Sequence, residues 1–85
     1  MNKSYYNAES NLIAKRLRQL RKERGFSQEE LAAQLQLLGV DINQPLISKI
    51  ERNRRFVKDY ELACLRQVLQ VSERDLLADF YNATE

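Results

Sequence analysis

The sequence contains no histidine and a single cysteine, Cys64, among its 85 residues. Without histidine, the chain lacks the usual general base, the commonest metal ligand and every Ser-His or Cys-His nucleophile pair. One thiol cannot form an internal disulfide or build a thiolate metal site. The common routes to catalysis are therefore missing, and we expect a binding protein that is not an enzyme and holds no metal ion or cofactor.

Glycine and proline are also scarce, with two residues and one residue respectively. Hairpins and sheets need such turn residues, whereas the abundant Leu, Arg, Gln, Glu, Lys and Ala favour helix. No apolar run is long enough for a transmembrane span or for the core of a signal peptide. These absences predict one small all-α domain, cytoplasmic and without a membrane partner.

The formal net charge of +2 conceals an uneven distribution of charge along the chain. Residues 1–58 carry 12 Lys/Arg and 6 Asp/Glu, whereas residues 59–85 carry 2 and 6. The first part therefore has a net charge of +6 and the second part a net charge of −4. An excess of positive charge in the first two-thirds favours an anionic partner there.

The first ten residues are polar and show no helical period, so residues 1–10 are expected to form an N-terminal arm. A domain over residues 11–82 follows. Its first helix is predicted to begin near Ser10 or Asn11, either of which can act as a cap. This helix is expected to end at Gly25.

The next two helices carry the clearest capping signals. Ser27, with the glutamate three residues later, forms a capping box at the start of a helix over residues 28–38. Asn43 can cap a third helix over residues 44–52. Pro45 lies at the second position of this helix, where its missing N–H costs no hydrogen bond.

The last two helices are predicted from a cap followed by a leucine stripe. Asp59 can cap the fourth helix, and Ser72 can cap the fifth. Helical spacing turns six apolar residues inward: Leu62, Leu65, Leu69, Leu76, Leu77 and Phe80. The sequence therefore predicts five helices in all.

The helix over residues 44–52 has two chemically different sides. Its outward side carries Gln44, Pro45, Ser48, Lys49 and Arg52, which bring amide, hydroxyl and cationic groups but no carboxylate. Glutamine can bond adenine N6 and N7, and lysine or arginine can donate to guanine O6 and N7. The alternative is an ordinary solvated helix face.

A cationic run follows this helix. Residues 52–58 include Arg52, Arg54, Arg55 and Lys58. Such a run can neutralise DNA phosphates and supply affinity that does not depend on sequence. The alternative is a solvated basic loop with no partner. Asn53 within it suits a left-handed C-cap position.

Three segments occur in a characteristic order: LRQLRKERGFSQEELA at residues 17–32, LISKIERNRR at residues 46–55 and ELACLRQVLQVSERDLL at residues 61–77. With them the chain resembles the Cro and phage-repressor type of helix-turn-helix protein, the XRE family. The resemblance implies a compact five-helix domain like that of lambda repressor. It also implies a sequence-specific binder of double-stranded DNA, commonly a homodimeric transcriptional repressor whose second motif helix lies in the major groove.

The resemblance also implies roles for individual residues. Residues 28–38 correspond to the first motif helix and residues 44–52 to the recognition helix. The positions expected to contact bases are Asn43, Gln44, Pro45 and Lys49, with Ser48 on the same face. The positions expected to contact phosphates are Gln28, Arg52, Asn53, Arg54 and Arg55, joined by Lys58 of the cationic run. Arg21 and Glu51 match a pair that forms an internal salt bridge.

One departure from the family lies between the two motif helices. Relatives usually place a glycine directly after the position of Leu35, whereas here Gln36 to Leu38 intervene and the turn occupies residues 39–43. The helix over residues 28–38 is therefore expected to gain about one turn.

The acidic last third of the chain is also compatible with a second function. The protein would then be a helical protein-interaction module, such as an antitoxin that binds a partner protein through this region.

In the family that the chain resembles, dimer contacts usually involve the C-terminal helix. Here these contacts are expected around Leu77, Phe80 and Tyr81.

Overall fold

Every regular element of the described part of the chain is a helix. The computed structural model describes residues 10–84, so the predicted arm lies outside the described residues except for Ser10. Within residues 10–84 there are six helices: α1 Ala14–Glu23, α2 Gln28–Leu37, α3 Gln44–Glu51, α4 Asp59–Leu69, α5 Glu73–Leu76 and α6 Ala78–Thr84. The predicted all-α class is confirmed.

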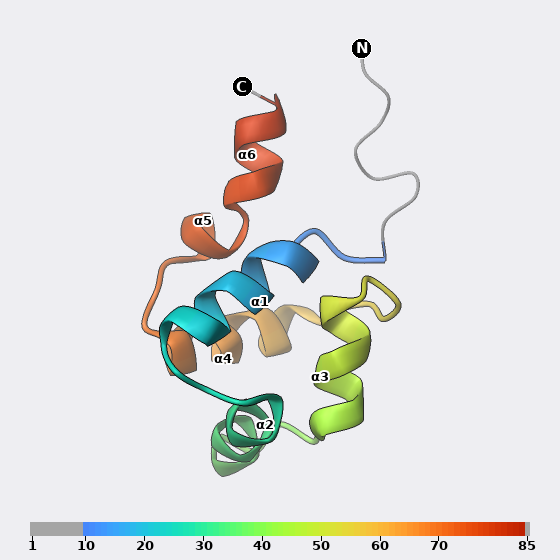
Figure 1. Ribbon diagram of the computed structural model, residues 1–85, viewed down its shortest axis with the longest axis vertical. Helices are drawn as coiled ribbons and strands as arrows, with labels where there is room; N and C mark the ends of the chain where they lie inside the picture. The colour runs from blue at the N-terminus through green and yellow to red at the C-terminus, as the bar shows by residue number, and fades with distance from the viewer. Residues whose placement is uncertain (1–9, 85) are drawn as a thin grey trace.

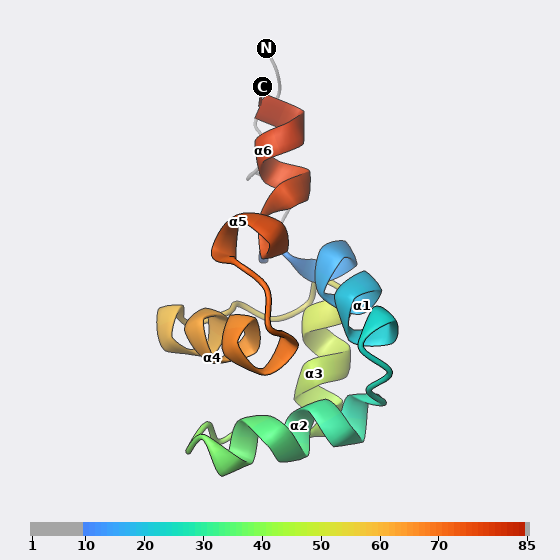
Figure 2. The ribbon, with the colours of Figure 1, turned by 90° about the vertical axis from the view of Figure 1, so that its left-hand side faces the viewer.

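The helices form a bundle from which the last helix projects. Helix α1 crosses the middle of the molecule, α3 lies at one edge, and α2 lies at the end opposite α6 (Figure 1). Helices α2 and α4 are stacked and run in opposite directions (Figure 2). Helix α6 packs against α5 and extends away from the rest of the bundle.

The core is a single cluster of aliphatic side chains shared by all the helices except α6. Packing joins α1 to α3 and α5, and α2 to α3 and α4. Full burial of each leucine or isoleucine contributes about 1.5–3 kcal/mol to folding. The buried apolar residues are Ile13, Leu17, Leu20, Leu31, Ala32, Leu35, Val40, Ile42, Ile47, Ile50, Leu65, Leu69 and Leu76.

Most of the predicted helix ends are confirmed. Ser27 Oγ accepts the Glu30 N–H at 3.0 Å, and Glu30 Oε1 accepts the Ser27 N–H at 2.8 Å, which completes the capping box. Asn43 caps α3, and Ser72 caps α5, each through a side-chain oxygen that accepts a backbone N–H. Gly25, with φ of 78°, supplies the left-handed residue after α1.

One predicted helix start and one predicted cap are wrong. Helix α1 begins at Ala14 and not near Ser10 or Asn11, because the Asn11 side chain donates to Ile50 O in α3 and to Arg55 O in the segment after it. The N-cap of α4 is Lys58 rather than Asp59, which is the first helical residue. Here the capping contact comes from inside the helix, since Glu61 Oε1 accepts the Lys58 N–H at 3.0 Å.

The prediction of a single helix after Ser72 is also wrong, because the chain forms two short helices there, α5 and α6. Leu76 is fully buried in the core, and the backbone leaves helical geometry at Leu77, with φ of −96° and ψ of 15°. The motif helices each end one residue earlier than predicted, because Leu38 and Arg52 are C-caps.

The lengthened turn between α2 and α3 is well packed and hydrogen-bonded. Gly39, with φ of 86°, donates its N–H to Gln36 O at 2.9 Å, and the Val40 N–H reaches Leu35 O at 3.1 Å. Gln36 Nε2 also donates to Ile42 O at 2.7 Å. Val40 and Ile42 are both buried. The additional residues therefore extend the core, and α3 follows directly from an anchored turn.

Candidate nucleic-acid interface

Helix α3 has a buried side and a free side, as its sequence predicts. Ile47 and Ile50 are fully buried under α1 and α2, whereas no other helix of residues 10–84 lies beyond the outer side of α3 (Figure 1). Of the five predicted base-contacting residues, Asn43, Pro45 and Lys49 are exposed. Gln44 and Ser48 are half-buried. The Asn43 side chain caps the helix by accepting the Leu46 N–H at 3.2 Å.

A buried ion pair lies beneath α3. Arg21 Nε donates to Glu51 Oε2 at 2.6 Å, and Arg21 Nη2 donates to Glu51 Oε1 at 3.1 Å. Only 9% of the arginine side chain and 3% of the glutamate side chain are exposed. Arg21 Nη1 also donates to Phe26 O at 2.8 Å. This pair joins the middle of the domain, at α1, to the last residue of α3.

Two glutamines continue from that pair to the outer surface. Gln28 Nε2 donates to Glu51 Oε1 at 3.0 Å, and Gln44 Nε2 donates to Gln28 Oε1 at 2.7 Å. The relay, as we call the series Arg21, Glu51, Gln28 and Gln44, connects α1, α2 and α3. It brings a predicted phosphate contact, Gln28, next to a predicted base contact, Gln44. Nothing in the sequence indicates this bond between side chains 16 residues apart.

The cationic run after α3 contains two kinds of residue. Arg52, Arg54 and Lys58 are exposed, whereas Arg55 is half-buried and paired. Its Nη1 and Nη2 donate to Glu61 Oε1 and Oε2 at 2.9 and 3.0 Å. The Arg55 guanidinium, predicted as a phosphate contact, therefore has an internal carboxylate partner. Glu61 was not singled out from the sequence, although it shares a helical stripe with Leu65 and Leu69.

The ion pair of Arg55 and Glu61 changes the acidity of both groups. Burial raises the pKa of the Glu61 carboxyl, but hydrogen bonds from Arg55 and from the Lys58 N–H outweigh it and leave that pKa below its ordinary value. The hydrogen bond to Glu61 raises the pKa of Arg55, against a smaller opposing effect of burial. Both groups are therefore held in their charged forms.

Two asparagines fix the position of this segment. Asn53, with φ of 60°, accepts the backbone N–H groups of Ser10 and Asn11 at its Oδ1, each at 2.9 Å. Asn11 Nδ2 donates in return to Ile50 O at 3.1 Å and Arg55 O at 3.0 Å. The predicted left-handed conformation of Asn53 is confirmed. Asn11 was foreseen only as a helix cap, and its contacts with residues 39 to 44 positions away are not visible in the sequence.

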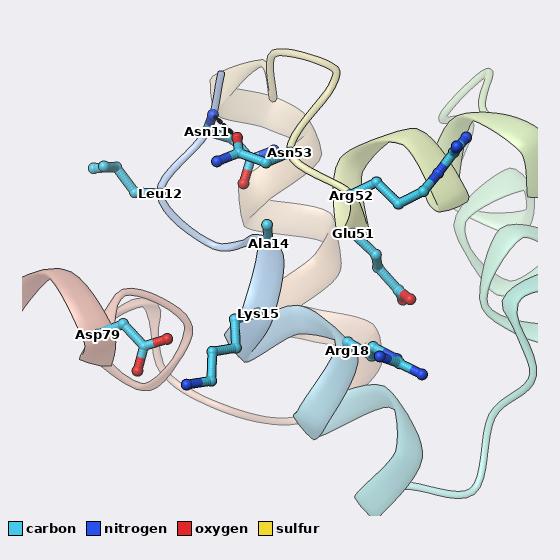
Figure 3. A pocket seen from close by; sticks show the side chains of 9 residues that line it. All are labelled: Asn11, Leu12, Ala14, Lys15, Arg18, Glu51, Arg52, Asn53 and Asp79. Carbon is cyan, nitrogen blue, oxygen red and sulfur yellow. Dashed lines mark hydrogen bonds between the residues drawn. The ribbon is translucent and has the colours of Figure 1, made fainter. Parts of the chain in front are cut away.

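Two open hollows next to α3 are bordered by cations. One, of about 310 Å³, is lined by Arg18, Arg21, Gln28, Ser48, Glu51 and Arg52. In the other, Lys15 and Arg18 project from α1, and Arg52 projects from the end of α3 (Figure 3). Carboxylates of Glu51 and Asp79 lie there too. The outer side of α3 is thus bordered by positive charge that comes from two helices.

This geometry combines a short exposed helix, a cationic segment at its C-terminal end and an amide oriented at its N-terminal end. A protein-family model described as a helix-turn-helix domain matches residues 14–79, from the start of α1 into α6. The chain belongs to the helix-turn-helix domain family. No curated protein sequence matches the chain. In helix-turn-helix proteins the second motif helix enters the major groove of DNA, so α2 and α3 are the motif helices here.

Across residues 10–84, no three Cys, Asp or Glu side chains lie close enough together to hold a metal ion. None of the helices in that range is both long and apolar enough to cross a membrane.

Proposed function

We propose that this helix-turn-helix domain is a sequence-specific regulator of transcription that binds double-stranded DNA and represses the genes it controls. The observation that carries the proposal is the position of Gln44, which lies at the N-terminal end of the exposed helix α3 and is oriented by Gln28. In helix-turn-helix complexes, N-terminal residues of the second motif helix contact base edges.

Base reading is assigned to the outer side of α3. Gln44 can bond adenine N6 and N7, and the exposed Lys49 can donate to guanine O6 and N7. Pro45 offers apolar contact to a thymine methyl, and Ser48 can bond any base. The Asn43 side chain is less available for base contacts, since its Oδ1 caps the helix. Each good base contact contributes roughly 1–3 kcal/mol of discrimination.

Phosphate binding is assigned to the two ends of the motif. Arg52, Arg54 and Lys58 are exposed beside the C-terminal end of α3 and can neutralise one DNA strand. Gln28 begins α2, a helix of ten residues whose N-terminal N–H groups favour an anion. Contacts on both sides of α3 would fix the depth at which it enters the groove.

We further propose that the protein binds DNA as a homodimer. A domain of this size buries little DNA interface alone, and a two-fold pair reads two half-sites about one helical turn apart. The dimer contact is assigned to the projecting end of the molecule around Leu77, Phe80 and Tyr81, where the two aromatic rings meet edge to face at 5.5 Å.

Selection of binding sites from a random pool of DNA duplexes tests the proposal, followed by titration of the winning site at two salt concentrations. A two-fold symmetric site and a steep salt dependence are expected. Gln44→Ala should relax the base preference, whereas Arg54→Ala should weaken binding to all sequences and reduce the salt slope by about one. In a reporter assay, a promoter that contains the selected site should be repressed.

The outcomes separate the two function classes. Enrichment of a defined sequence that is lost in Gln44→Ala supports the DNA-reading role. Absence of binding even at low salt would contradict it and would favour a protein partner, for which the acidic last third of the chain supplies the complementary charge.

A further inference from the structure

The relay has a fixed direction. An ionised carboxylate can only accept hydrogen bonds, and the Glu51 side chain is 3% exposed. Gln28 therefore turns its Nε2 toward Glu51, at 3.0 Å, and its Oε1 toward Gln44. Gln44 must then direct its own Nε2 inward, at 2.7 Å from Gln28 Oε1. The negative charge of Glu51 thus decides which atom of each amide faces outward.

We propose that Glu51 is a positioning residue that makes Gln44 prefer adenine to guanine, although Glu51 itself touches no base. The inference rests on the proposed DNA-reading function. With one N–H used inward, Gln44 offers one acceptor and one donor, which is the pattern that matches adenine N6 and N7. A reversed amide would accept inward and offer two N–H donors, which is the pattern that matches guanine O6 and N7.

Arg21 decides which way the side-chain amide points in the Glu51→Gln variant. A guanidinium only donates, and Arg21 Nε makes the shorter of its two bonds to Glu51, at 2.6 Å. In Glu51→Gln the amide oxygen stays on Arg21 Nε, and the amide nitrogen takes the place of Oε1, with loss of the 3.1 Å bond from Nη2. That nitrogen donates to Gln28, which has to reverse, and Gln44 reverses with it. The preferred base is therefore expected to change from adenine to guanine.

The experiment compares Kd for two duplexes that differ only in adenine or guanine at the base whose preference is lost in Gln44→Ala. The wild type is expected to prefer adenine by roughly 5- to 150-fold. Glu51→Gln should lower the ratio of the affinities for the adenine and guanine duplexes by roughly tenfold or more. Where the wild-type preference is smaller than this, the variant should prefer guanine. Equal loss of affinity for both duplexes, with the ratio unchanged, overturns the proposal.

Glu61→Gln is the matched control. Glu61 is also 3% exposed and also holds an arginine through both oxygens, but its remaining partner is the backbone N–H of Lys58. This variant loses a buried charge of the same kind without changing an amide near the bases. The ratio of its affinities for the adenine and guanine duplexes should equal that of the wild type. A change of the ratio as large as in Glu51→Gln would show a general loss of structure and overturn the proposal.

A second variant decides the question if Glu51→Gln does not fold. Gln28→Met interrupts the relay with an apolar side chain of similar length, so Gln44 can turn either way and the ratio should fall toward one. An unchanged ratio in Gln28→Met overturns the proposal.

An NMR measurement needs no DNA. In the free wild-type protein, one Nε2 proton of Gln44 should be protected from solvent exchange and the other exposed. Both should be exposed in Glu51→Gln, and the absence of a protected proton in the wild type overturns the proposal. If the wild type selects no DNA site at all, the proposed function fails, and this spectrum still reports on the relay.

Discussion

Two buried pairs of arginine and glutamate hold the motif in place, and they differ in what lies next to them. Arg21 and Glu51 join α1 to the end of α3, and Arg55 and Glu61 join the cationic segment to α4. In each pair both carboxylate oxygens accept from the guanidinium, and the glutamate is 3% exposed. The arginines differ, with 9% and 20% exposed.

The difference lies in the remaining hydrogen bond of each carboxylate. Glu51 accepts from a side chain, Gln28, which passes the interaction on to Gln44 at the surface. Glu61 accepts from the backbone N–H of Lys58, where the interaction ends. Similar ion pairs therefore orient a side-chain amide in one case and hold a helix terminus in the other. An ion pair in the interior is informative about function mainly through its further partners.

The largest effect is expected from Arg21→Ala. Removal of one partner leaves the Glu51 carboxylate buried without its cation, which should lower the free energy of unfolding by roughly 3–5 kcal/mol. Urea titration followed by circular dichroism measures this. Arg18→Ala, at an exposed position on the same helix, is the control and should change stability by less than about 0.5 kcal/mol. Similar stabilities of the two variants would contradict a structural role of the buried pair.

Arg55→Ala should have the next largest effect. Because its side chain is 20% exposed, the expected loss is about 2–3 kcal/mol, below the usual range for a fully buried pair. In DNA titrations, the salt slope of this variant should stay close to that of the wild type. A slope reduced by about one, without loss of stability, would instead assign Arg55 to a phosphate.

Acid should weaken the second pair by a smaller amount. The pKa of folded Glu61 lies below its ordinary value, so its contribution to stability is fully present above the pKa of an unfolded glutamate. It is lost as the pH falls below the ordinary pKa of glutamate and through the lower pKa of the folded state. The difference in unfolding free energy between the wild type and Glu61→Gln should narrow from pH 7 to pH 3. A constant difference over this range would contradict the assignment.

The smallest effect on stability is expected at the exposed neighbour of Arg55. Arg54→Ala removes an exposed guanidinium and should change the unfolding free energy by less than about 0.5 kcal/mol. Its DNA affinity should fall alike for selected and random sequences, with a salt slope smaller by about one. Fluorescence anisotropy at several salt concentrations measures both. A loss restricted to the selected site would instead indicate base reading.

Local contacts of this molecule could be predicted from the sequence, whereas long-range contacts could not. Helix ends set by local contacts were predicted, as at Ser27, Asn43 and Gly25, because cap and helix lie within a few residues of each other. The partners of Asn11 and Arg55 were not, because these contacts depend on how the helices pack.

For the candidate site, the sequence predicted which residues lie on the outer side of α3 but not how their amides are oriented. That orientation depends on Glu51, which the resemblance identified only as the salt-bridge partner of Arg21. The bonds among Glu51, Gln28 and Gln44 form only after α2 and α3 have packed. Glu61 was open to prediction, since a carboxylate in line with Leu65 and Leu69 requires a cation.

The anchored turn between α2 and α3 bears on the entropy of association. Gln36, Val40 and Ile42 hold it through a hydrogen bond and two buried side chains, so its backbone freedom is lost during folding. A partner that docks on α3 meets a rigid body and has no loop to order. Less conformational entropy then opposes association, and α3 can dock with little change of shape.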